Sequence, residues 1–542
     1  MNAAAVIEHF AIRWLVQEAP GTGTVDAARL DSARFDALAA ALLDGPLEDA
    51  LAAAGVASDD EICIRSVVVP ELALRLSQPD AIILDAWSRA IAAAVASAAG
   101  TSGGNAEGVV RYRSRSHAVV DVVVRCLTGG RAPVWAWRQL GLWPDGLGEG
   151  GAWAGGADLP SAVAAHLLRL LMARPELVVP VMVTLAGQGR LETAVASFGA
   201  AGLRDLAEAA WRAAGGNTVP EPAARRWGPQ AWPIPAAPAR GREPGSRPPA
   251  DPAALTAEAL LQRSRLTTAL RAGPRYSAAL ARTWAVLVVL ESEPAAGVDP
   301  DSAALLAAVA GALDAGGAAG SGPSVYEPAG NGALPAGITA ETVTAAPDPA
   351  QGSAADVEHG DAAGSRTGWA GLLYTLHVVE ELEVPARLAA AGAGPAGGLR
   401  NALHALGVWM LAVAAPEEPP DAADPALLAF SGLPDAAALR SDSALAHAGL
   451  QADAAQVLRN AIHREGAKVA AEVIRRAAPE DPDPAAALAR VCRRPGLIVR
   501  DPGWTDVVLD LSEVDTEVRR AGLDLDLGYL RWLGCVVRFR YV

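Results

Sequence analysis

The histidines are the residues of this chain best suited to acid–base or metal chemistry, because imidazole titrates near neutral pH and ligates metals. None of them forms an HExxH motif or a pair four residues apart, so no zinc-binding helix is predicted. A hydrolase would need His377 or His404 beside a carboxylate in a deep pocket. We favour the interpretation that these histidines pack in a core or on a helix surface. The eight are His9, His117, His166, His359, His377, His404, His447 and His463.

A glycine-rich segment at 392–397 matches the spacing of a dinucleotide-binding fingerprint. That fingerprint requires a strand before the glycines, whereas helix-like sequence precedes them here. A glycine-rich connection between helices is the better interpretation. The sequence also contains no P-loop, so we predict neither a nucleotide nor another cofactor.

An aspartate-rich segment, Asp524 to Gly528, resembles the opening of a calcium-binding loop. Leu527 interrupts the alternating oxygen ligands that such a loop needs. We therefore interpret the segment as a turn in which Asp524 and Asp526 face solvent or pair with Arg519 and Arg520. No metal site and no catalytic residue are predicted, and we expect the protein not to be an enzyme.

The four cysteines, Cys63, Cys126, Cys492 and Cys535, are far apart and have apolar or arginine neighbours. Their spacing fits neither a zinc site nor a redox motif. They are predicted to be buried free thiols of a protein in a reducing compartment.

The charge of the chain is acidic, with 45 basic and 61 acidic residues and a net charge of −16. Such a chain is poorly suited to bind polyanions as a whole. If residues 109–115 are extended, Arg111, Arg113 and Arg115 share one side, yet on an acidic chain they pair more often with carboxylates. We predict no nucleic-acid partner.

Three tryptophans, Trp135, Trp137 and Trp143, form the densest aromatic cluster. Packing between helices is the first interpretation. A partner-binding surface is the second, because tryptophan and arginine are enriched at interface hot spots.

The length of 542 residues exceeds what one hydrophobic core supports, so two to four domains are expected. The predicted order is an α+β region at 1–130, a helical region at 131–214, a Pro/Gly/Arg linker at 215–252, a short helical segment at 253–314, a disordered low-complexity linker at 315–367, a helical region at 368–496 and a strand–helix–strand module at 497–542.

The carboxyl-terminal module has the clearest pattern. Val507, Leu509 and Leu511 alternate with aspartates, as in a half-buried strand. Residues 512–515 read as a capping box, and the helix that follows is predicted to stop at Gly522. A last strand at 535–542 completes the module.

The amino-terminal region reads as strand, helix, strand, helix. Alternation at 10–16 and 72–76 predicts the strands, and helical spacing through Leu38 and Leu42 and through Ile83 and Trp87 predicts the helices. The fold class is therefore mainly α with α+β terminal regions: a multi-domain protein of helical layers with a small sheet built from N- and C-terminal strands.

Membrane and targeting signals are not apparent. The amino terminus lacks a positively charged start, and no apolar run reaches the ~18 residues that span a bilayer; the run at 405–415 falls short. We expect a cytoplasmic protein without a membrane span.

Three segments carry a resemblance to a known family: "RDPGWTDVVLDLSEVDTEVRRAGLDLDLGYLRWLGCVVRFRYV" at the carboxyl terminus, "GWAGLLYTLHVVEELEVP" and "DPALLAFSGL". Together they resemble the tape-measure-like proteins of extracellular contractile injection systems, the phage-tail-like particles of bacteria. The resemblance implies a non-enzymatic protein that sets tube length or organises tube and baseplate assembly, and that contacts tube or baseplate subunits or copies of itself. The high proline and glycine content argues against one continuous helical ruler, which favours a scaffold role.

Two other functions stay open on the sequence. The chain is alternatively a cytoplasmic helical adaptor unrelated to injection particles, or a hydrolase with an unrecognised site. For the favoured role, the predicted protein-interaction residues are Trp504, Arg519, Arg520, Asp524, Asp526, Trp532, Trp135 and Trp137.

Overall fold

The chain folds into two units, which the computed structural model describes in part. Unit 1 comprises residues 1–126 and 130–153, and unit 2 comprises 127–129 and 154–542. The described residues are 32–43, 45–54, 61–69, 78–100, 108–130, 132–147, 159–216, 219, 252–272, 278–298, 302–318, 364–393, 398–418, 421–435 and 452–542.

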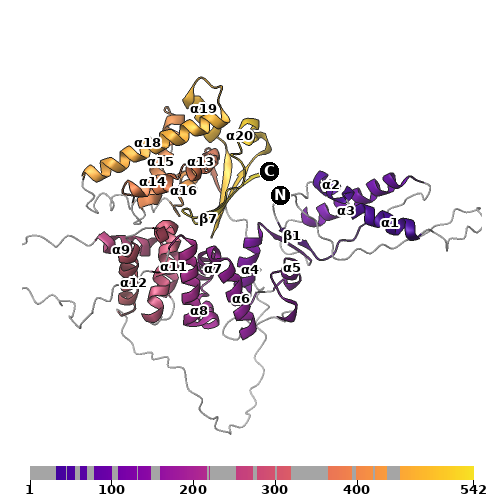
Figure 1. Ribbon diagram of the computed structural model, residues 1–542, viewed down its shortest axis with the longest axis horizontal. Coiled ribbons are helices and arrows are strands. Elements are labelled where there is room, and N and C mark those ends of the chain that lie inside the picture. The colour runs from indigo at the N-terminus through magenta and orange to yellow at the C-terminus, as the bar shows by residue number, and fades with distance from the viewer. Residues whose placement is uncertain are drawn as a thin grey trace, which may run out of the picture. The chain divides into compact units, whose positions relative to one another are not determined.

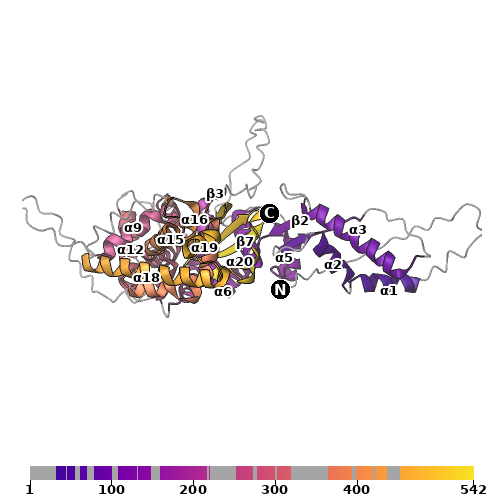
Figure 2. The same cartoon turned by 90° about the horizontal axis from the view of Figure 1, so that it is seen from above.

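Unit 1 contains a cluster of three helices and a small two-stranded sheet. A core of Leu38, Leu42, Leu47, Ile83 and Trp87 joins its first three helices, which Figure 2 shows lying against one another. The elements are α1 (Ser32–Leu43), α2 (Pro46–Ala53), β1 (Glu61–Ile64), α3 (Asp80–Gly100), β2 (Val109–Tyr112), α4 (Arg115–Thr128), α5 (Val134–Gln139) and the 3-10 helix η2 (Asp145–Leu147). Strands β1 and β2 pair in an antiparallel register.

The first part of unit 2 is helical. Its helices pack against one another, with α8 against α6, α7 and α11, and α12 against α9 and α11. The elements are α6 (Ser161–Ala173), η3 (Pro175–Leu177), α7 (Val178–Gly187), α8 (Leu191–Ala213), α9 (Pro252–Arg263), α10 (Arg265–Ala272), α11 (Ala278–Ser292), η4 (Pro294–Val298) and α12 (Ser302–Ala318).

The second part of unit 2 combines helices with a sheet. Figure 1 shows α18 lying across α13, α14 and α15, all of which it contacts. The helical elements are η5 (Ala370–Thr375), α13 (Leu376–Glu381), α14 (Val384–Ala390), α15 (Gly398–Ala414), α16 (Pro425–Ser431), α18 (Ala452–Ala477), α19 (Pro484–Cys492), η7 (Leu511–Glu513) and α20 (Thr516–Arg520).

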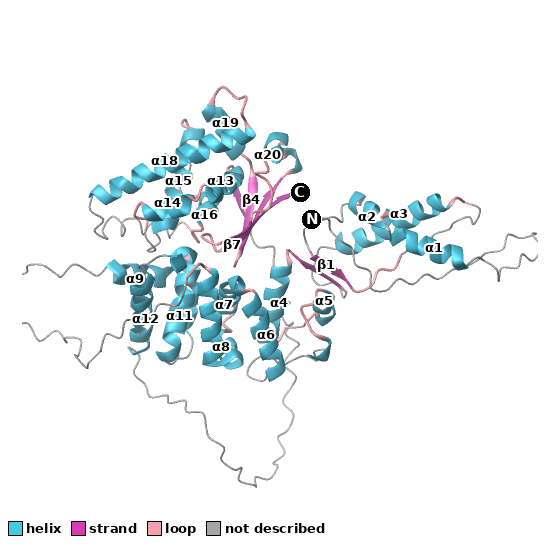
Figure 3. Cartoon of the chain, in the orientation of Figure 1, coloured by secondary structure: helices cyan, strands magenta, loops and turns pink. Residues whose placement is uncertain are grey.

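The sheet of unit 2 has five strands in the order β3-β4-β5-β7-β6. Only β5 and β7 pair in parallel, which requires the chain to cross over between them through η7 and α20. Figure 3 shows β4 and β7 of this sheet near the carboxyl terminus. The strands are β3 (Ser365–Thr367), β4 (Gly496–Asp501), β5 (Trp504–Leu509), β6 (Gly528–Leu530) and β7 (Cys535–Tyr541).

The structure confirms the predicted fold class, a mainly α protein with an α+β terminal region. The helical spacing through Leu38 and Leu42 corresponds to α1, and that through Ile83 and Trp87 to α3. The predicted sheet built from both N- and C-terminal strands is not what the described residues form. Among the described residues, the amino-terminal strands pair with each other and the carboxyl-terminal strands form a separate sheet with β3.

Several predicted segments lie outside the described residues. These are the strands at 10–16 and 72–76 and almost all of the two predicted linkers, 215–252 and 315–367. Their predicted conformations stay predictions.

One described helix is long and apolar enough to cross a membrane. It is α3, and 22% of its apolar window is buried inside the structure. The helices Ser161–Ala173 and Pro175–Gly187 pass the same test only as a pair bent by 105°. Because this test considers only length and composition, the expected absence of a membrane span stays a prediction.

Candidate functional site

The carboxyl-terminal module, residues 497–542, is held together by a charged pair inside its sheet. Asp506 on β5 lies opposite Arg538 on the parallel strand β7. Both side chains are buried, and Arg538 Nε donates to Asp506 Oδ1 at 3.0 Å. The alternating pattern predicted Asp506 on a solvent-facing side. That prediction was wrong, because the strand lies in the middle of the sheet, where both of its faces are covered.

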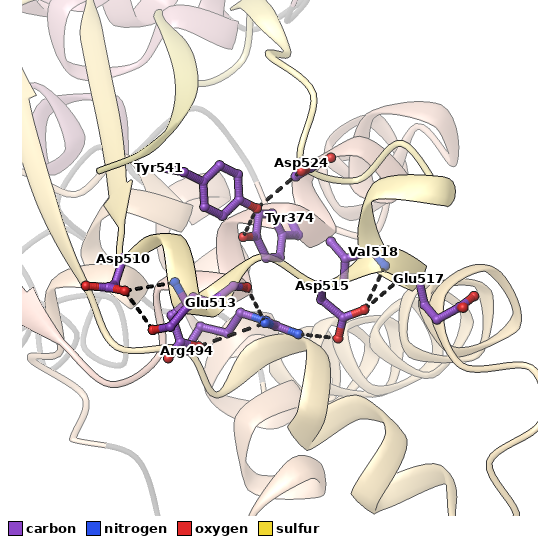
Figure 4. A network of polar contacts seen from close by, with 10 residues as sticks. Tyr374, Arg494, Asp510, Glu513, Asp515, Glu517, Val518, Asp524 and Tyr541 are labelled. Atoms are coloured by element: carbon purple, nitrogen blue, oxygen red, sulfur yellow. Dashed lines mark hydrogen bonds and ion pairs between the residues drawn. The ribbon is translucent and has the colours of Figure 1, made fainter. Parts of the chain in front are cut away.

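Arg494 fastens the crossover to the end of α19. Its buried guanidinium donates to Glu513 O at 2.6 Å and to Asp515 Oδ2 at 2.7 Å (Figure 4). Burial opposes ionisation of Asp515, but hydrogen bonds from Arg494 and from two backbone amides lower the pKa of this carboxyl below its ordinary value. The crossover is thereby locked in one conformation.

The caps of the crossover differ from the predicted capping box at 512–515. Asp515, not Ser512, caps α20, and its Oδ1 accepts from the amides of Glu517 and Val518 at 2.8 and 3.3 Å. Asp510 caps the preceding 3-10 turn. The predicted stop at Gly522 is confirmed, since this glycine adopts φ 69° just after the helix.

A chain of hydroxyls joins the last strand to η5, far away in the sequence. The Tyr374 and Tyr541 hydroxyls lie 2.8 Å apart, and the Tyr541 hydroxyl donates to Asp524 Oδ2 at 3.2 Å (Figure 4). Burial raises the pKa of both tyrosines, so both stay protonated at neutral pH. The chain is suited to fixing positions and not to exchanging protons.

Four of the predicted interaction residues lie inside the module or support its turns. Trp504 is only 2% exposed, and Trp532 donates from Nε1 to Glu380 Oε2 at 2.5 Å. Asp524 is buried beside Tyr541. Asp526 is exposed, but its Oδ1 accepts from the amide of Phe539 at 2.9 Å. This agrees with a turn and not with a calcium loop.

Arg519 and Arg520 are the predicted interaction residues that lie on the surface. Their side chains are 60% and 69% exposed. Arg519 contacts Asp524 at 3.3 Å, and Arg520 contacts Glu517 at 2.8 Å. The Arg520–Glu517 pair is exposed on both sides and contributes little to stability, whereas Arg519 pairs with the buried Asp524. Both guanidiniums lie at the surface.

An exposed apolar cluster beside this helix was missed by sequence reasoning. Leu511 and Val542 are 65% and 70% exposed and are joined by the hydrogen bond from Leu511 N to Val542 O. Val514 is also exposed and follows Leu511 by one turn. The pattern assigned Leu511 and Val514 to buried faces, because alternation shows which residues share a face but not whether that face is covered. We call Leu511, Val514, Val542, Arg519 and Arg520 the terminal surface.

The two predicted interaction tryptophans of unit 1 differ in burial. Trp137 is fully buried and donates from Nε1 to the Tyr112 hydroxyl at 2.8 Å, and its ring centroid lies 5.6 Å from that of Trp143. Trp135 is half-buried. Core packing is therefore confirmed for Trp137 and Trp143.

The candidate catalytic histidines each form a hydrogen bond with a backbone carbonyl. His377 Nε2 lies 2.8 Å from Leu525 O, and His404 Nε2 lies 2.8 Å from Ala422 O. In the part of the chain that the structure describes, no three His, Cys, Asp or Glu side chains are grouped to hold a metal ion. A backbone carbonyl thus holds each of the two rings.

The cysteines are free thiols, as predicted. Cys63, Cys126 and Cys492 are buried and Cys535 is partly buried. Burial raises the pKa of Cys126 and Cys492 to about 12, so both remain unreactive thiols at neutral pH.

The three arginines at 111–115 do not form one extended row. Arg111 belongs to β2, whereas Arg115 begins α4 and donates to Leu140 O. The extended row considered in the sequence is therefore interrupted between β2 and α4.

A scan against protein-family models finds no match, and searches of the curated proteins and of the solved structures find none either.

Proposed function

We propose that this chain is a non-enzymatic structural or assembly protein of a contractile injection system. It acts in tube or baseplate assembly and contacts its partners through the terminal surface. It is assembled in the cytoplasm of a bacterium and is retained in the particle. The observation that carries the proposal is the terminal surface, which combines exposed apolar and exposed basic side chains on a rigid support.

The rigidity of that support favours an interface over a flexible tail. Arg494 clamps the crossover, Tyr374 holds the last strand, and β7 lies between β5 and β6. A segment that is held in this way presents its side chains in one arrangement, which lowers the entropy that binding must overcome.

The dimensions of the described helices favour a scaffold over a ruler. The longest of them, α18, has 26 residues. At ~1.5 Å per residue it spans about 39 Å, which is far shorter than an injection tube would require of a continuous helical measure. The family resemblance therefore supports a role in organising assembly.

Co-purification from the native host tests the proposal directly. We expect tagged protein from cells that express the particle to recover tube, sheath or baseplate subunits, and the gene to lie beside sheath and tube genes. Recovery of free monomer alone, together with normal particles in a deletion strain, would contradict the role. It would leave the adaptor function as the better explanation.

A pair of matched variants tests the surface. We expect Arg519→Ala with Arg520→Ala to reduce recovery of partner subunits about tenfold while the soluble yield stays unchanged, because interface arginines contribute more than exposed ion pairs. Arg475→Ala is the control, since Arg475 is 66% exposed and pairs with a glutamate three residues away, as Arg520 does. An equal loss of solubility and partner recovery would indicate a folding role.

A further inference from the structure

Helix α18 carries several basic side chains around one carboxylate. That carboxylate belongs to Glu465, which is only 1% exposed. Lys468 Nζ lies 3.0 Å from Glu465 Oε2, and Arg464 Nε lies 2.9 Å from Oε1. Arg387 of the neighbouring helix α14 approaches Oε2 within 3.6 Å. Burial opposes ionisation of Glu465, but hydrogen bonds from Arg464 and Lys468 lower the pKa of its carboxyl, so it is ionised at neutral pH.

One carboxylate does not balance these three cations. The side chains of Arg387, Arg464 and Lys468 are 46%, 60% and 43% exposed. Among the described residues, Glu465 is the only carboxylate that pairs with any of them, and Glu383, four residues before Arg387, forms no ion pair with it. The three cations also repel one another, because they surround the same two oxygen atoms. We call Arg387, Arg464 and Lys468 the α18 basic face.

The last turns of the same helix differ from this face, because there each arginine has a carboxylate. Arg475 pairs with Glu472 at 2.5 Å, and Arg476 pairs with Glu381 at 2.5 Å. The excess of positive charge on α18 is therefore local. It stands out on a chain whose net charge is −16.

The support of the basic face is rigid. At Gly466, α18 approaches α15 so closely that an added Cβ would lie 2.6 Å from the ring of Trp409. The same ring stacks on His463, with centroids 6.0 Å apart. The face also continues into an apolar residue. Val457 is 56% exposed and lies two turns before Arg464, on the same side of the helix.

The spacing of these side chains indicates the form of a partner. Arg464 and Lys468 are four residues apart, which places them ~6 Å apart along the helix axis. A second helix with two carboxylates four residues apart presents its charges at the same separation. A nucleic acid is the less suitable partner, because the acidic chain as a whole repels a polyanion.

We propose that the α18 basic face binds an acidic amphipathic helix of a partner protein. Two carboxylates of that helix contact the three cations, and an apolar side chain next to them covers Val457. The incoming carboxylates supply the negative charge that Glu465 alone does not. This surface is distinct from the terminal surface, and the proposal does not depend on the injection-particle role, which would stand if it failed.

Calorimetric titration of the full-length chain with blocked peptides tests the proposal. The probe is acetyl-Ala-Leu-Ala-Ala-Glu-Ala-Leu-Ala-Glu-Ala-Leu-Ala-amide, and the matched peptide has glutamine in place of both glutamates. We expect the glutamate peptide to bind with a Kd of about 1 mM or tighter and about fivefold more tightly than the glutamine peptide, because each exposed charge pair adds a factor of about two to three.

A chemical label reports on the face directly. Lys468 is the only lysine of the sequence, so its acetylation by an amine-reactive ester is readily followed by mass spectrometry. The glutamate peptide should slow this acetylation more than the glutamine peptide does at the same concentration. Equal protection by the two peptides would contradict binding at this face.

Three variants locate the binding. Arg464→Gln and Lys468→Gln should each reduce the preference for glutamate to about twofold, and both leave Glu465 paired with the remaining cations. Arg459→Gln removes the same charge from another side of α18, where Arg459 contacts Gln456, and should leave the preference unchanged.

Four results would overturn the proposal. They are equal binding of both peptides, no binding of either at about 10 mM, an equal effect of Arg459→Gln, and tighter binding of a short oligothymidylate than of the glutamate peptide. The last result would assign the face to a nucleic acid.

Discussion

At the scale of single residues, the Asp515 carboxylate both caps a helix and pairs with an arginine. One oxygen caps α20 and the other receives the buried Arg494 guanidinium. Removing a partner from a buried charge leaves the remaining charge uncompensated, which costs more than the pair contributes. The terminal surface depends on this carboxylate, because η7 and α20 carry most of its side chains.

Two substitutions separate the contribution of the helix cap from that of the ion pair with Arg494. Asp515→Asn keeps an acceptor for the helix cap but loses the charge, and should lower the free energy of unfolding by about 1 to 2 kcal/mol. Asp515→Ala should cost about 1 kcal/mol more, because the cap is lost as well. Urea unfolding followed by circular dichroism measures both, with Asp510→Asn, on the solvent-exposed cap of η7, as the control. Wild-type stability in Asp515→Asn would exclude a role for the Arg494 contact.

At the scale of elements, Arg476 connects two helices that are far apart in the sequence. From α18 it contacts Glu381 of α13 at 2.5 Å and Glu472, one turn earlier on α18, at 2.7 Å. Hydrogen bonds from Arg475 and Arg476 lower the pKa of Glu472 to about 2, and the hydrogen bond from Arg476 lowers that of Glu381. Both carboxylates therefore stabilise the fold in their ionised forms.

The stabilisation should depend on pH in a defined direction. A lowered folded-state pKa adds stability above the ordinary value of 4.5, and this stability is lost as the pH falls toward 2. Arg476→Gln should cost about 1 kcal/mol near neutral pH, because the pairs are partly exposed. The difference from wild type should shrink at about pH 3. Urea midpoints at the two pH values test this, with Arg459→Gln as control, and a difference that does not change with pH would contradict it.

At the scale of the whole molecule, the division into two units decides which parts depend on one another. The hydrophobic core of the carboxyl-terminal half draws on residues from Trp369 to Phe539, all within unit 2. The small core of α1, α2 and α3 belongs to unit 1 alone. Each unit buries its own apolar side chains, as separate domains do.

A fragment of residues 154–542 should therefore fold without unit 1. We expect it to be soluble and to keep the urea midpoint that the full-length chain shows for unit 2, because the contacts that hold the terminal surface are intact. Hydrogen exchange followed by mass spectrometry can compare the peptides of β5 and β7 in both proteins. Loss of protection in the fragment would show that unit 1 supports the sheet.

The sequence by itself determined the local elements. The helical spacing of Ile83 and Trp87 and the glycine stop at 522 report backbone preferences and shared faces, which depend only on neighbouring residues. The mainly α fold class was predictable from these helical patterns. The free buried thiols were predictable from the wide spacing of the cysteines and their apolar neighbours. Aspartates at 510 and 515 are good capping residues, yet which helix turn each of them caps depended on where the backbone turned.

Only the tertiary structure decided which faces are covered and which charges meet. Asp506 and Arg538 are 32 residues apart and become partners because β5 and β7 pair in parallel. Trp504, predicted to contact a partner, is interior, whereas Leu511, assigned to a buried face, is exposed. Burial and charge compensation are properties of packed elements, and a one-dimensional pattern contains no information about which element will cover a given face.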